Sequence, residues 1–67
     1  MPQMQNVELG SRFVKRELPN VIWTVEKVFQ IASEPAHARL HKETHPRDKM
    51  TVSIQTLNNP RFFRRAS

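Results

Sequence analysis

The chain has 67 residues, of which eleven are lysine or arginine and six are aspartate or glutamate, so its formal net charge at pH 7 is +5. A chain of this length supports one small hydrophobic core and excludes a second domain. The absence of cysteine excludes disulfides, thiolate metal sites and cysteine nucleophiles, and it favours a reducing, cytoplasmic location.

The N-terminal residues show no targeting signal. Residues 1–6 are polar and include Pro2, and no apolar run approaches the roughly 18 residues of a membrane-spanning helix. We therefore expect a flexible N-terminus over residues 1–8, with no export and no membrane insertion. Gly10 is the only glycine, and it is expected to form a turn that leads into a first strand over residues 12–17.

The strongest strand signal follows a break at residues 18–20, which contain a proline. Residues 21–30 are rich in β-branched and aromatic side chains, and an extended backbone places Trp23 and Val25 on one face. The inward positions change from odd to even numbers between Val25 and Val28. This change predicts a bulge or a strong bend within the strand.

Residues 33–46 allow two interpretations. As a helix over about residues 34–45, the segment would stack His37, His41 and His45 four residues apart, a spacing that could hold a metal ion. Such a helix would have little apolar surface to bury. As a strand over residues 37–42, the segment alternates, and residues four apart lie about 13 Å from each other, too far to share one ion. We favour the strand and predict no metal site.

The C-terminal third predicts a strand, a turn and a final strand. Residues 49–55 alternate most clearly, with Met50, Val52 and Ile54 facing inward. Residues 56–60 suit one turn of 3-10 helix, because a single apolar residue lies between a capping threonine and a proline. A short last strand is expected over residues 61–64, followed by a basic tail end at residues 65–67.

Together these elements predict an all-β fold with a single domain over residues 9–64. Hairpin-length connections make the sheet antiparallel, and we expect a small five-stranded barrel with a short 3-10 turn before the last strand. The alternative is an α+β fold with a helix near residues 34–45. The expected core consists of apolar side chains from every strand but the last and from the turn: Phe13, Val21, Trp23, Val25, Leu40, Met50, Val52, Ile54 and Leu57.

The stretch from Leu9 to Phe63 resembles small bacterial β-barrel proteins of the Src-homology-3-like type, whose functions are uncharacterised. The matching segments are residues 10–13 (GSRF), 23–25 (WTV), 37–40 (HARL) and 51–54 (TVSI). These segments are mostly packing positions, so the resemblance implies a fold and no function. The acidic loop and paired aromatic residues with which Src-homology-3 domains bind polyproline are not recognisable.

The residues that could carry chemistry do not form a recognisable catalytic set. The six acidic residues are scattered singly, and most lie beside a basic neighbour, as expected for a solvated surface. Ser53, His41 and Asp48 could make a nucleophile set, but nothing marks a strained nucleophile turn. One glycine excludes a glycine-rich phosphate loop. A barrel of this size is also expected to lack a drug-sized pocket of about 300 Å³ or more unless it oligomerises. We therefore predict a non-enzymatic binding module without a cofactor.

Two binding functions fit the sequence. In the first, the domain binds RNA or single-stranded DNA through basic side chains that contact phosphates. The candidate contacts are the cations of the strands, loops and tail: Arg12, Arg16, Arg39, Lys42, Arg47, Lys49, Arg61, Arg64 and Arg65.

In the second, the domain is a protein-interaction module or a small subunit of a larger assembly. It would bind through an exposed strand edge or through an apolar patch around Phe62 and Phe63. Strand alternation sends these two rings to opposite faces. Phe62 or Phe63 could then lie exposed beside Arg61 and Arg64, or both rings could cover the open end of the barrel.

Overall fold

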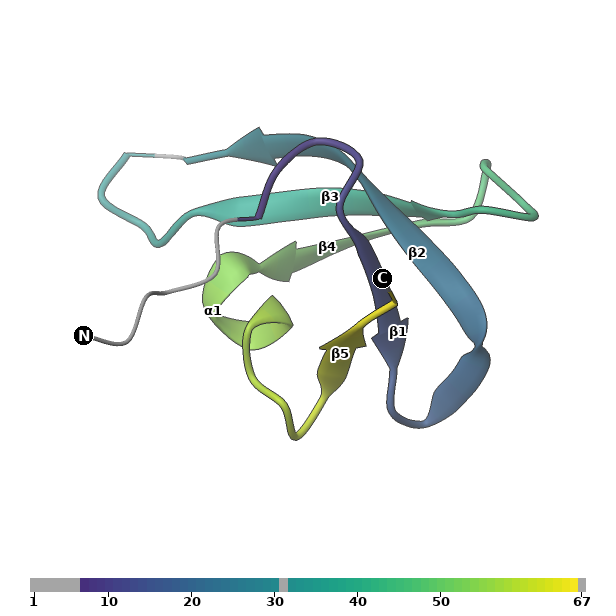
Figure 1. The fold of residues 1–67 in the computed structure, drawn as a ribbon. Helices are drawn as coiled ribbons and strands as arrows, with labels where there is room; N and C mark the ends of the chain where they lie inside the picture. Colours follow the sequence, from purple (N-terminus) through teal and green to yellow (C-terminus); the bar gives the residue numbers. More distant parts are fainter. Residues whose placement is uncertain (1–6, 31, 67) are drawn as a thin grey trace.

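The computed structural model describes residues 7–30 and 32–66, so residues 1–6 of the predicted flexible N-terminus lie outside the described residues. The elements are β1 (Arg12–Lys15), β2 (Leu18–Phe29), β3 (His37–Lys42), β4 (Lys49–Ser53), α1 (Ile54–Leu57) and β5 (Phe63–Arg65). The strands form one antiparallel sheet of five in the order β4-β3-β2-β1-β5 (Figure 1). The predicted five-stranded antiparallel sheet is confirmed.

Strand β3 decides between the two interpretations of the middle segment. Its residues alternate in burial, and Ala38 and Leu40 are fully buried while Arg39 between them is exposed. An extended backbone gives this pattern, because successive side chains point to opposite faces of a sheet. The strand over residues 37–42 is confirmed, and the alternative helix near residues 34–45 is wrong.

Strand β2 is the long central strand and contains the predicted bulge. Val25 pairs with Leu40, and the next ladder pair joins Lys27 to Arg39, so Glu26 is the extra residue. β2 also begins earlier than predicted, at Leu18, because the exposed residues around Pro19 continue the β1–β2 hairpin as extended backbone. The predicted break at residues 18–20 is therefore extended backbone, at the end of the β1–β2 hairpin that lies next to its turn.

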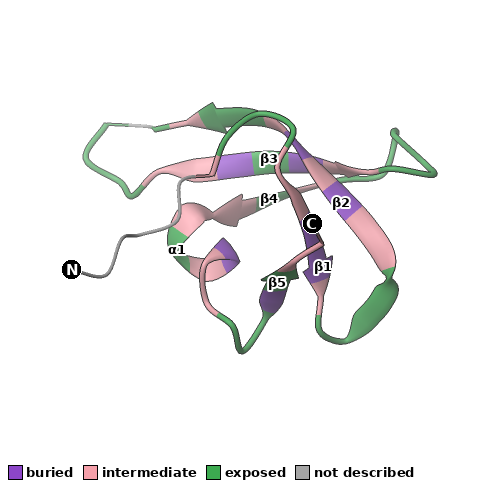
Figure 2. Cartoon of the chain, viewed as in Figure 1, coloured by how far each residue is buried: buried purple, intermediate pink, exposed green. Residues whose placement is uncertain are grey.

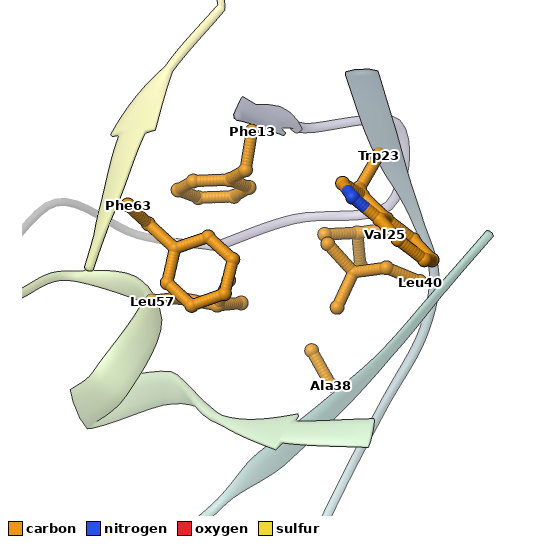
Figure 3. Close-up of a cluster of buried hydrophobic side chains, with 7 residues drawn as sticks. All are labelled: Phe13, Trp23, Val25, Ala38, Leu40, Leu57 and Phe63. Carbon is orange, nitrogen blue, oxygen red and sulfur yellow. The ribbon is translucent and has the colours of Figure 1, made fainter. Parts of the chain in front are cut away.

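The hydrophobic core lies on one face of the sheet (Figures 2 and 3). Seven buried side chains form it: Phe13, Trp23, Val25, Ala38, Leu40, Leu57 and Phe63. Four predicted core residues, Val21, Met50, Val52 and Ile54, are only partly buried and pack against this cluster. Burial decreases towards β4 because β4 is an edge strand, with a neighbour on one side only.

Helix α1 replaces the predicted 3-10 turn at residues 56–60. The hydroxyl of Ser53 accepts a hydrogen bond from the backbone N–H of Thr56 at 3.0 Å and so caps the helix. Ile54 consequently belongs to the helix and not to the end of β4. The helix is one turn long, and it brings Leu57 into the core.

The sheet is not closed into the predicted barrel. β4 and β5 are the two edges of the ladder, and within residues 7–30 and 32–66 they do not pair with each other. Instead, α1 and the turn after it carry the chain from one edge to the other (Figure 1). None of the helical structure in the described residues has the length and apolarity to span a membrane.

Candidate functional site

The side of the sheet opposite the core, which we call the outer face, carries charged side chains that form ion pairs. Arg12, Thr24, His41 and Lys49 lie in register on four neighbouring strands and form one row across this face. Cross-strand partners in an antiparallel sheet project from the same side, so these four side chains are neighbours. We call them the neutralised row, because two carboxylates bind them.

Glu43 neutralises one end of this row. Its carboxylate accepts hydrogen bonds from two guanidinium nitrogens of Arg12 and, at 3.1 Å, from the hydroxyl of Thr24. The hydrogen bond from Arg12 lowers the pKa of Glu43 and raises the pKa of Arg12. Arg12 is therefore already paired with an anion.

Glu26, the bulge residue of β2, neutralises the other end. Its carboxylate accepts hydrogen bonds from the ammonium of Lys49 at 2.9 Å and from Nδ1 of His41 at 2.9 Å. These hydrogen bonds, with that from Lys49 the larger effect, lower the pKa of Glu26. The bulge thus places a carboxylate between two basic side chains of neighbouring strands.

The next row of the outer face has no such carboxylate. Lys27 on β2 pairs directly with Arg39 on β3, and Arg39 pairs with Thr51 on β4. Both cations are exposed, and among the described residues neither forms an ion pair. Like charges directly opposite each other destabilise a sheet. The pair therefore leaves a local positive charge that an anion from solution would relieve.

An aromatic pair lies beside these cations. The rings of Phe29 on β2 and His37 on β3 stack with centroids 6.2 Å apart and an interplanar angle of 27°, and the ammonium of Lys27 lies 5.7 Å from the Phe29 centroid. Nδ1 of His37 donates to the carbonyl oxygen of Pro35 at 2.7 Å, which fixes the orientation of the imidazole ring. We call Lys27, Arg39, Phe29 and His37 the basic strip.

A cleft lies at the open side of the sheet, and we call it the edge cleft. It has a volume of about 630 Å³, within the range of ligand sites, so the expectation that the chain lacks a pocket of this size is wrong. Its lining comes from β4, α1 and the ends of β1 and β5: Lys15, Arg16, Glu17, Met50, Thr51, Val52, Thr56, Arg61, Phe62 and Phe63.

The nine cations predicted to bind nucleic acid do not form one surface. Arg12, Lys42 and Lys49 are in ion pairs, with Glu43, Asp48 and Glu26 respectively. Arg16 donates to the carbonyl oxygen of Pro60 at 2.6 Å, and the Arg65 guanidinium lies 5.0 Å from the Phe13 ring centroid. The remaining four cations are exposed at separate places. Arg39 lies on the outer face and Arg47 on the turn before β4, whereas Arg61 lies at the edge cleft and Arg64 on β5.

Sequence reasoning missed Lys27 as a contact residue and missed Phe29 and His37 as an aromatic pair. The bulge at Glu26 decides which residues of β3 these side chains face. The change in the inward pattern of β2 indicated a bulge, but it did not give the register with β3. Only the paired strands show that Lys27 and Arg39 are neighbours.

The adjacent phenylalanines differ in burial, although Phe62 lies in the turn before β5 and not within the strand itself. Phe63 is 5% exposed and belongs to the core, whereas Phe62 is 54% exposed. Phe63 is therefore not available as part of an exposed apolar patch, and that prediction is corrected. Phe62 remains accessible, at the edge cleft and next to Arg61.

The three histidines lie apart and have separate partners. His37 contacts Pro35, His41 contacts Glu26, and His45, in the turn after β3, contacts the hydroxyl of Thr44 at 2.9 Å. In the described part of the chain, no three residues of the metal-ligating types are close enough to bind one ion.

The suggested nucleophile set is not assembled either. The hydroxyl of Ser53 donates to the hydroxyl of Thr56 at 2.8 Å. The imidazole of His41 bonds to Glu26, and Asp48 forms an ion pair with Lys42. Each member of the set is thus engaged with a different partner.

No protein-family model, curated protein or solved structure matches this chain.

Proposed function

We propose that the protein is a non-enzymatic module that binds single-stranded nucleic acid, RNA or DNA, on its outer face. The observation that supports this proposal most directly is the basic strip. Lys27 and Arg39 face each other across two strands without a carboxylate, and the Phe29–His37 pair lies beside them.

The chemistry of the strip fits a nucleotide. A phosphate between Lys27 and Arg39 would offset the repulsion of these two cations and would accept hydrogen bonds from both. A base of the same strand could stack on the ring pair, since aromatic side chains accept any base on their faces. Binding of this kind depends on phosphate charge and stacking, and it carries little sequence preference.

The neutralised row limits the length of the contact. Its cations already bind Glu43 and Glu26, so the uncompensated charge of the sheet centre is confined to Lys27 and Arg39. We therefore expect a short contact in which these two cations bind about one phosphate each. The affinity should decrease with salt, with a slope of log K against log salt of about 1.4 for two phosphates.

The experiment is a salt titration of binding to a fluorescein-labelled single-stranded oligonucleotide, followed by fluorescence anisotropy. Each phosphate contact on a single strand contributes about 0.7 to the slope of log K against log salt. The double variant Lys27→Gln/Arg39→Gln should bind more weakly, and its slope should be shallower by about 1.4.

A second double variant, Arg47→Gln/Arg61→Gln, is the matched control because it removes the same charge from exposed sites away from the strip. It should keep the slope of the unmodified protein. No binding at low salt would refute the proposal. Equal losses in the two variants would show that net charge, and not the basic strip, drives binding.

We also propose that the fold belongs to the Src-homology-3-like type. Five short antiparallel strands with one helical turn before the last strand support this assignment. The open ladder between β4 and β5 is the feature in which the sheet departs from a closed barrel.

A further inference from the structure

The edge cleft lies where the sheet leaves two strands without a second neighbour. β4 pairs only with β3, and β5 pairs only with β1. Three consecutive residues of β4, Met50 to Val52, line the cleft, although their side chains alternate between the two faces of the sheet. The cleft therefore adjoins the backbone edge of β4.

The register shows which backbone groups of β4 are unpaired. The N–H of Lys42 donates to the oxygen of Asp48, and the N–H of Ile54 donates to the oxygen of Ala36, each at about 3 Å. In an antiparallel ladder, hydrogen-bonded pairs alternate with non-bonded pairs. Met50 and Val52 consequently bond to β3.

Lys49 and Thr51 then direct their backbone N–H and C=O groups away from β3, towards the free edge. Among the described residues, no hydrogen bond to these four groups is found. The corresponding edge of β5 is partly used, since the N–H of Phe63 donates to the oxygen of Asn59 at 3.1 Å. The free edge of the sheet is thus at β4.

The side chains that line the cleft include an apolar group, which we call the floor, and a cationic group, which we call the rim. Met50, Val52 and Phe63 supply apolar surface, and the 54% exposed ring of Phe62 adds to it. Lys15, Arg16 and Arg61 give the rim three positive charges against the single negative charge of Glu17. A ligand of this cleft should be apolar on one side and acidic near the rim.

We propose that an extended acidic segment of a partner protein adds to the free edge of β4 as a sixth strand and occupies the edge cleft. Backbone hydrogen bonds from Lys49 and Thr51 would hold the segment, as in other complexes formed by strand addition. Alternate side chains would lie on the apolar floor, and acidic side chains would meet Lys15, Arg16 or Arg61.

Charge disfavours the simplest competing occupant. A second copy of the chain would bring the same cationic rim against this one, and like charges across an interface oppose association. A nucleic acid would match the rim charge, but it lacks the regular alternation of donors and acceptors that the edge of β4 presents. The free backbone groups favour a peptide.

The test uses defined peptides. The probe is a fluorescein-labelled octapeptide of alternating valine and glutamate, and its anisotropy is measured on titration with the full chain. Two control peptides replace glutamate with lysine or carry N-methyl groups on alternate backbone nitrogens of one edge. We expect saturable binding of the acidic peptide and at least about tenfold weaker binding of both controls.

A pair of variants at one position separates backbone from side-chain effects. Thr51→Pro removes the outward N–H without removing a ladder bond, because proline is tolerated where the N–H faces away from the neighbouring strand. Thr51→Val keeps the N–H and serves as the matched control. Thr51→Pro should bind the peptide at least about tenfold more weakly than Thr51→Val does. Tryptophan fluorescence checks that both variants are folded.

Several results would overturn the proposal. The first is equal binding of the N-methylated and unmodified peptides, a comparison that stands even if Thr51→Pro does not fold. The second is unchanged affinity in folded Thr51→Pro. The third is a dimer of the unmodified protein, seen by light scattering, that becomes a monomer in Thr51→Pro, since the edge would then bind a second copy. Failure of oligonucleotide binding would leave this proposal standing, because the two surfaces use different residues.

Discussion

The neighbouring residues Phe62 and Phe63 allow one substitution to be compared in two environments. The ring of Phe63 is 5% exposed within the core, and that of Phe62 is 54% exposed at the edge cleft. Replacing a buried phenylalanine by alanine costs about 3–5 kcal/mol, and the cost is smaller where the surroundings can collapse. Because β5 is a short edge strand, we expect Phe63→Ala to lower the free energy of unfolding by about 3 kcal/mol.

The ring of Phe62 is about half buried, so Phe62→Ala should cost about 1 kcal/mol. A domain of 67 residues has a total stability of about 3–10 kcal/mol. For a domain of this size, each kcal/mol changes the Tm by about 4–8 °C. We therefore expect Phe63→Ala to lower the Tm by about 12–24 °C, close to loss of the fold, and Phe62→Ala by about 4–8 °C.

Urea unfolding measures this difference directly. Trp23 is the only tryptophan and lies in the same core cluster as Phe63, so its fluorescence reports on the loss of the core. The dependence of the unfolding free energy on urea should be unchanged in both variants, as expected when stability alone is altered. Equal losses for the two variants, or a larger loss for Phe62→Ala, would refute the placement of these rings.

Two further predictions concern charge and backbone conformation. Hydrogen bonds to cations hold the pKa values of Glu26 and Glu43 below 4.5 in the folded state, so their stabilisation is present above that pH and is lost as the pH falls through the lowered values. Urea midpoints measured from neutral to acid pH should fall less for Glu26→Gln/Glu43→Gln, and an unchanged acid dependence would contradict this. Gly10 has a φ of +88° and Ala32 a φ of 51°. Gly10→Ala should therefore cost about 1 kcal/mol in thermal unfolding, whereas Ala32→Gly should change stability by less than about 0.5 kcal/mol. Equal effects would contradict the two conformations.

The fold could largely be predicted from local patterns. Alternation of apolar and polar residues identified β3 and β4, and the change in the pattern after Val25 indicated the bulge of β2. These features depend on residues near each other in the chain. Closure of the sheet could not be predicted, because it depends on whether β4 and β5 meet after the capping bond of Ser53 begins α1.

The candidate sites depend on which residues far apart in the sequence become neighbours in the sheet. The sequence does not show these neighbours. Charge alone predicted Arg12 and Lys49 as phosphate contacts, yet carboxylates far away in the sequence form ion pairs with them. Lys27 and Arg39 form a pair only because the bulge sets the register of β2 with β3. Composition could therefore indicate a basic domain, but it could not indicate which cations lack an anion.

The strand order also has a consequence for how the chain folds. The β1–β2 and β3–β4 hairpins join residues close in sequence, whereas β5 pairs with β1 across about fifty residues. Closing such a long loop costs more entropy, and β5 contributes only three residues in return. We expect β5 to join the sheet last and to leave it first, so the backbone amide of Arg64, bonded to β1, should exchange with solvent faster than that of Ala38 on β3. One side of the edge cleft would then be the least stable part of the sheet.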